Sequence, residues 1–180
     1  MAEDKRAPMA AAPMVYREDG SADWGNMWTS YCALAQEGGP PHRGTLLPAP
    51  ADADPTSSQY QAVVAELTRG IKEVSDLDAA PDAPGWLAVR CPSPAMALWL
   101  ADAVKEENVE ARHMDAKLLV PVGADFQLTG EIKNIITVVG KTTHYWHEHL
   151  APEVKQTLVW QTRAQDVLRW LQARLGVNTT

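Results

Sequence analysis

The sequence predicts an α+β fold: a small mixed or antiparallel sheet packed with several helices, the longest of them at the C-terminus. Three observations favour this class. Apolar residues recur at i, i+3, i+4 and i+7 over residues 57–75 and over much of 126–175, as in amphipathic helices. Short apolar runs at 86–90 and 117–122 are typical of strands. A chain of 180 residues with 46% hydrophobic side chains has the size and composition of one globular domain.

The order of elements follows from these periodicities and from the residues that end them. Residues 1–13 are rich in Ala and Pro and are expected to form a disordered tail, with a single α+β domain over residues 14–180. The expected elements are a helix at 23–37, a Pro-rich loop at 38–55, a helix at 57–75, a polar connection at 76–85, a strand at 86–90, a helix from Pro94 to Glu107, a hairpin of strands at 109–114 and 117–122, a helix at 126–149 and a last helix ending near Leu175.

Two local signals mark the ends of the middle helix. Ser93 is placed as its N-cap with Pro94 in its first turn, and Asn108 suits a residue that stops a helix. The centre of the chain then reads β-α-β-β-α, which matches in part a ferredoxin-like unit that lacks its last strand. This match concerns the order of elements only.

Composition excludes several classes of function. A net charge of −7 argues against general nucleic-acid binding, which needs clustered Lys and Arg. No run approaches the roughly 18 apolar residues of a membrane-spanning helix, so no membrane contact is expected. The N-terminal residues do not resemble an export signal, and two cysteines are too few for a disulfide framework. We therefore expect a cytoplasmic protein.

The stretch KTTHYWHEHL, residues 141–150, holds three of the five histidines. On a helix, His144, His147 and Glu148 share one face, and such ligands suit a divalent transition metal such as Zn. The order His-x-x-His-Glu differs from the zinc-peptidase signatures, in which the Glu lies between the histidines. His149 is expected to point away from this face. The alternative is a set of surface histidines that interact with the negative end of a helix.

The same helix carries a polar stripe of Lys133, Thr137 and Lys141 above His144. Lys141 could hold a small anionic ligand as a point charge, although such a stripe is more often the solvated side of a helix. Upstream, His42 and Arg43 follow Gly and Pro residues and could engage a carboxylate or a phosphate.

Tryptophan is abundant, with seven Trp and one Phe. Trp24 and Trp28 lie one helical turn apart and could wall a pocket, or pack on the domain or on a second subunit. Cys91 follows a strand and precedes a helix, where a thiol can be reactive, but Pro92 and Pro94 remove N–H groups that would stabilise a thiolate. A structural cysteine beneath the sheet is the alternative.

The function expected from these features is that of a binding or accessory protein. It would recognise a protein partner or a small ligand through Trp-rich surfaces and form a homodimer, partly through a wide apolar face on residues 153–175. The alternative is a small enzyme, possibly metal-dependent, that uses His144, His147 and Glu148.

Overall fold

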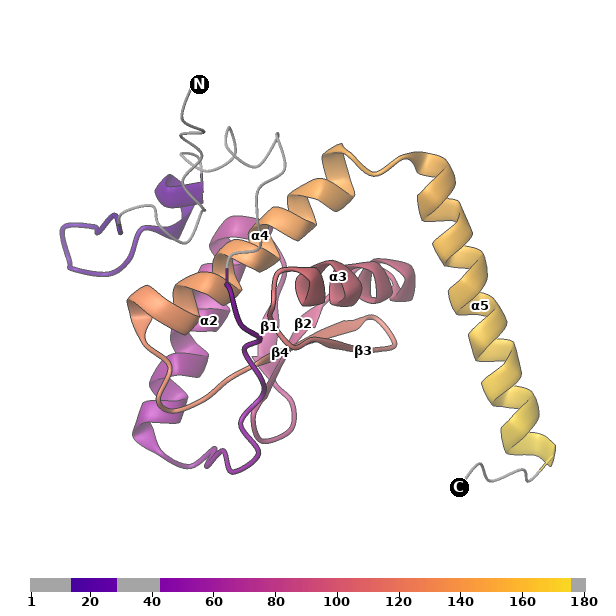
Figure 1. Cartoon of the computed structure of the whole chain (residues 1–180), viewed down its shortest axis with the longest axis horizontal. Coiled ribbons are helices and arrows are strands. Elements are labelled where there is room, and N and C mark those ends of the chain that lie inside the picture. The colour runs from indigo at the N-terminus through magenta and orange to yellow at the C-terminus, as the bar shows by residue number, and fades with distance from the viewer. Residues whose placement is uncertain (1–13, 29–42, 176–180) are drawn as a thin grey trace.

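The protein is built on a four-stranded antiparallel sheet with strand order β1-β2-β4-β3. The structure, a computed structural model, describes residues 14–28 and 43–175 (Figure 1). The strands are β1 (Ala79–Pro81), β2 (Trp86–Arg90), β3 (Arg112–Met114) and β4 (Lys117–Pro121). The α+β class is therefore confirmed, and the sheet is antiparallel. The expected disordered tail at 1–13 lies outside the described residues.

Helices cover one face of this sheet. After a helical stretch at residues 24–28, the helices are α2 (Ser58–Ser75), α3 (Pro94–Glu106), the π-helical turn η2 (Leu128–Ile132), α4 (Lys133–Glu148) and α5 (Pro152–Leu175). α2 contacts β1 and α4, while α3 contacts β3, β4, α4 and α5. Side chains of β2 and β4 alternate, so Leu87, Val89, Leu118 and Val120 are fully buried beneath the helices. In Figure 1, α5 lies at one end of the molecule, on the far side of α3 from α2.

The predicted caps of α3 are confirmed. The Ser93 hydroxyl accepts a hydrogen bond from the Met96 N–H at 3.2 Å, and Pro94 is the first helical residue. Asn108 has a φ of 59°, a left-handed conformation that no helix can continue. Its side-chain amide donates to the Arg43 carbonyl at 2.6 Å, which ties the preceding loop to the end of α3.

The prediction of an irregular connection at 76–85 is wrong in part, because this segment contains β1. Ala79, Ala80 and Pro81 lie opposite Val89, Ala88 and Leu87 of β2. Three small or rigid residues carry no alternation from which a strand could be predicted, and proline is tolerated because β1 is an edge strand. β1 occupies the edge beside β2 that the last strand of a complete ferredoxin-like unit would take.

Lys133 and Thr137, at the start of the polar stripe of α4, do not lie on a solvated side of the helix. Lys133 is 4% exposed and Thr137 is 3% exposed, because α4 is packed between α2 and α3. The Thr137 hydroxyl donates to the Lys133 carbonyl at 2.8 Å, which satisfies it within the helix. Burial lowers the pKa of Lys133 below its usual value. The expected helix at 126–149 is also divided, since its first turn is the π-helical η2.

The C-terminal helix α5 leaves large apolar side chains in contact with solvent. Trp160 is 70% exposed, and Val167 and Leu168 are 57% and 58% exposed. Thr162 is buried in the contact of α5 with the rest of the chain. Within the described ranges, no helix combines the length and the apolar character that crossing a membrane requires.

Candidate functional site

A groove of about 440 Å³ lies between α3 and α4. Its volume falls within the range of small-molecule sites, which extends from roughly 300 to 1,000 Å³. The groove is lined from α3 by Trp99, Asp102, Ala103 and Glu106, from the end of α3 by Glu107, and from α4 by Lys141, Thr142 and Tyr145. These positions recur every three or four residues on each helix, so each helix turns one continuous stripe toward the groove.

The polar centre of the groove is an ion pair between its two walls. The Lys141 ammonium lies 2.5 Å from a Glu107 carboxylate oxygen, and each side chain is only 12% exposed. A pair so poorly solvated loses most of its hydration, and this cost offsets much of the Coulomb attraction. Such a pair therefore contributes little net stability, yet it places a donor and an acceptor where a ligand could reach them.

Aromatic rings form the apolar part of the groove. The Trp99 ring packs against the Trp146 ring with centroids 5.8 Å apart and an angle of 52° between planes. Trp146 is buried, so it holds Trp99 in place from behind. Tyr145 is 41% exposed on the opposite wall. A half-exposed Trp fixed by a buried Trp is a rigid surface for an organic ligand.

The rim of the groove is acidic. Asp102 accepts a hydrogen bond from Lys105 at 3.0 Å, and this pair is exposed. Glu106 is exposed on the same helix, one turn further along. Three carboxylates thus line a groove that contains a single ammonium group. Because Glu107 already neutralises Lys141, a further anion gains little here, whereas a neutral or cationic group is favoured.

The histidine cluster has a different geometry from the one expected. The Nε2 atoms of His144 and His149 lie 3.3 Å apart. His149 is the C-cap residue of α4, with a φ of −119°, and its ring lies against the His144 ring with centroids 5.2 Å apart. The expectation that His149 does not join the face of His144, His147 and Glu148 is therefore wrong in part, because its ring contacts His144. His147 and Glu148 are exposed at the end of α4.

One ring from the helical stretch at 24–28 and one from α4 itself extend this cluster. Trp28 meets His144 edge-on at 5.9 Å, and Tyr145 meets His149 at 5.0 Å between centroids. The described part of the chain contains no group of three His, Cys, Asp or Glu side chains arranged to hold a metal ion. A metal at His144, His147 and Glu148 stays a prediction.

Of the remaining predicted site residues that the structure describes, Trp24, Arg43 and Cys91 do not line the groove. Trp24 is 1% exposed and its indole N–H donates to Glu66 at 2.8 Å, so it is a satisfied core residue. The Arg43 guanidinium donates to the Thr45 carbonyl at 3.3 Å and lies 3.7 Å from Glu131. His42 falls outside the described residues.

Cys91 is 4% exposed, at the end of β2. Burial raises the pKa of its thiol to about 11. The raised pKa means that the folded chain keeps the thiol protonated where the unfolded chain would ionise it. This contribution to stability is complete below pH 9.0, the pKa of an ordinary thiol, and is lost as the pH rises through about 11.

We expect Cys91 to resist alkylation in the folded protein. A pKa raised by about two units lowers the thiolate fraction at neutral pH by about a hundredfold. Iodoacetamide at pH 8 should therefore modify the Cys91 peptide much more slowly in buffer than in urea, as measured by mass spectrometry. Equal rates in the two solvents would show that the thiol is accessible and would contradict this assignment.

Comparisons with protein-family models, with curated proteins and with solved structures find no match.

Of the residues in the groove, only Lys141 was predicted from the sequence as a site residue. Trp99, Glu106 and Tyr145 were missed, because each lies on a helix whose facing partner is unknown until the fold is formed. One signal was present: Trp99, Ala103 and Glu106 lie at i, i+4 and i+7 and form one face of α3. That face carries both an aromatic ring and a carboxylate, and a helix face packed into the core would not usually carry a carboxylate.

Proposed function

We propose that this chain is a small cytoplasmic binding protein that holds an organic molecule with a neutral or cationic head group in the groove between α3 and α4. The observation that carries the proposal is the nearly buried Lys141–Glu107 ion pair within an aromatic hollow. A charge pair of little net value to stability, placed in a ligand-sized groove, supports a role in recognition.

The side chains that line the groove favour a particular chemical class of ligand. Trp99 and Tyr145 offer ring faces to an aromatic or aliphatic body, and a ring face also attracts a cation. The acidic rim adds to that attraction and opposes an anion. Glu107 can accept a hydrogen bond from the head group, while the Thr142 side chain lies on the opposite wall.

Three probes that share a phenyl ring and differ in charge test this proposal. Phenethylamine, 2-phenylethanol and 3-phenylpropionate would be titrated into the labelled protein, with NMR shifts of the Trp99 indole N–H and of α3 and α4 amides as the readout. We expect the amine to bind most tightly and the carboxylate at least about tenfold more weakly. Absence of shifts with all three probes, or tightest binding of the carboxylate, would contradict the proposal.

A variant that fills the groove tests whether phenethylamine binds there or elsewhere on the protein. Ala103→Leu places a larger side chain in the groove and should weaken binding of phenethylamine by about tenfold or more. The matched control is Ala65→Leu, which adds the same side chain at an exposed position of α2. Equal affinities in the two variants would show that the amine binds elsewhere.

The expected homodimer stays a prediction, and α5 supports it. Trp160, Val167 and Leu168 follow the spacing i, i+7, i+8 and form one exposed apolar stripe. A long helix of this kind gains most of its stability from packing, and two copies could cover each other's stripe. The alternative of a metal-dependent enzyme also stays a prediction, since the described histidines form a pair without a third ligand.

A further inference from the structure

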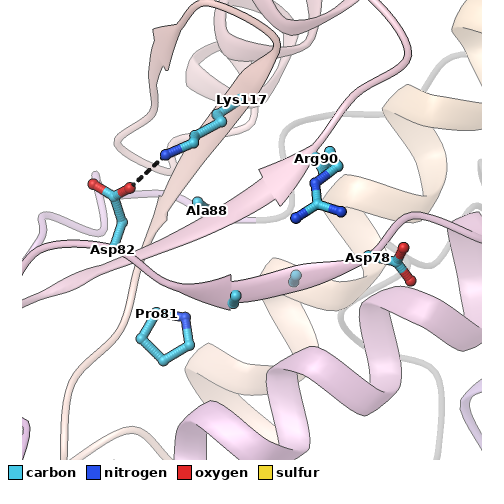
Figure 2. Close-up of a pocket in the computed structure, with 8 residues that line it drawn as sticks. Asp78, Pro81, Asp82, Ala88, Arg90 and Lys117 are labelled. Carbon is cyan, nitrogen blue, oxygen red and sulfur yellow. Dashed lines mark hydrogen bonds and ion pairs between the residues drawn. The ribbon is translucent and has the colours of Figure 1, made fainter.

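A second cavity lies on the face of the sheet that the helices do not cover. It has a volume of about 160 Å³ and is bounded by β1, β2 and the start of β4. Its floor is formed by Ala80 and Ala88, which lie directly opposite each other on neighbouring strands. Two methyl groups leave a hollow that larger side chains would fill. Figure 2 shows Arg90 and Lys117 on the strands around it.

Two cationic side chains border this cavity. Arg90 of β2 and Lys117 of β4 are directly opposite partners in the sheet, and both line the hollow. Like charges placed directly opposite each other destabilise a sheet. An anion bound between them would remove this repulsion.

The two carboxylates near the cavity are paired with lysines and not with Arg90. Asp82 lies 3.1 Å from the Lys117 ammonium, and Asp78 lies 3.2 Å from Lys72 on α2. Within the described part of the chain, the guanidinium of Arg90 forms no ion pair (Figure 2). The Arg90 backbone N–H donates to the Asp78 carbonyl at 2.8 Å. The cavity therefore offers a planar, charged group with donors to spare.

We propose that this cavity binds the carboxylate of a small aliphatic acid. The Arg90 guanidinium would hold both carboxylate oxygens with two parallel N–H···O bonds, and the short carbon chain would rest on Ala80, Ala88 and Pro81. A volume of 160 Å³ equals that of about five water molecules, which fits a carboxylate with a chain of two or three carbons. Asp78 and Asp82 at the border disfavour a doubly charged phosphate.

This site is independent of the groove, which lies between two helices on the covered side of the sheet. It also provides a place for the small anionic ligand that the sequence had suggested near Lys141. At the groove that ligand would meet three carboxylates, whereas here it meets a guanidinium that forms no ion pair among residues 14–28 and 43–175.

The test uses propionate, its neutral amide propionamide, and inorganic phosphate. Each would be titrated into the full chain at constant ionic strength, with amide NMR shifts of Ala88, Arg90 and Lys117 as the readout. We expect saturable shifts with propionate and about tenfold weaker binding of the other two. Binding of phosphate or propionamide as tight as that of propionate, or no shifts with propionate, would overturn the proposal.

Three variants locate the binding. Arg90→Gln removes the charge and Ala80→Leu fills the hollow at an exposed strand position, and each should weaken propionate by about tenfold or more. The matched control is Arg112→Gln, on the same sheet face but stacked over the Trp86 ring at 4.3 Å and outside the cavity lining. An equal loss in Arg112→Gln, or unchanged binding in Ala80→Leu, would show that propionate responds only to surface charge.

Discussion

Gly70→Ala is expected to lower the free energy of unfolding by about 1–3 kcal/mol. Helix propensity alone predicts the opposite, a gain of up to about 1 kcal/mol for this substitution in α2. The structure reverses the sign because α2 packs tightly against α4 at this residue. A methyl group here would lie 2.2 Å from the Ile136 Cδ1 atom and 3.0 Å from the Trp24 ring. Both neighbours are buried and have little room to move.

Urea unfolding followed by circular dichroism would measure this effect. The matched control is Gly25→Ala, since Gly25 is also helical and an added methyl group there meets nothing within 4 Å. We expect that control to be neutral or stabilising. A stabilised Gly70→Ala variant would show that the two helices separate easily and that their contact is looser than described.

Lys141→Met is expected to destabilise the protein by about 3 kcal/mol, whereas Lys141→Met combined with Glu107→Leu should be nearly neutral. Removing one partner leaves a carboxylate that is only 12% exposed without its ammonium. Removing both charges also removes the cost of their desolvation, so the apolar pair can replace the ionic one. The two effects are therefore strongly non-additive.

A double-mutant cycle from urea unfolding curves measures this coupling. The control is Lys105→Met, because its pair with Asp102 is exposed, with side chains 50% and 66% accessible, and should contribute less than about 1 kcal/mol. If Lys141→Met lowers the free energy of unfolding no more than Lys105→Met does, the Lys141–Glu107 pair is well hydrated and is not a buried recognition group.

The double variant also separates stability from function. A folded protein without Lys141 and Glu107 should lose its preference for phenethylamine over 3-phenylpropionate in the groove, because the head group then meets an apolar wall. A double variant that keeps the preference would place the recognition of charge on the rim residues Asp102 and Glu106 instead.

The sequence predicted correctly those features of secondary structure that depend only on neighbouring residues. Ser93 caps α3 and Asn108 ends it, because a side chain three residues away and a left-handed backbone suffice for these roles. Short apolar runs placed β2 and β4, and period 3.6 placed α2. β1 was missed because its three residues carry no such pattern and it is defined by pairing with β2.

The candidate sites depended on contacts between distant segments. Lys141 was identified on α4, but its partner Glu107 comes from the end of α3, 34 residues earlier. Arg90 and Lys117 meet only because β2 and β4 pair in one register. The sequence by itself determined the α+β class, most helices and strands, and the caps of α3, since these follow from short-range periodicity and backbone preference. Only the tertiary structure decided which faces are covered, that Lys133 is buried, and where the groove and the sheet cavity form, because burial depends on which surfaces the chain brings together.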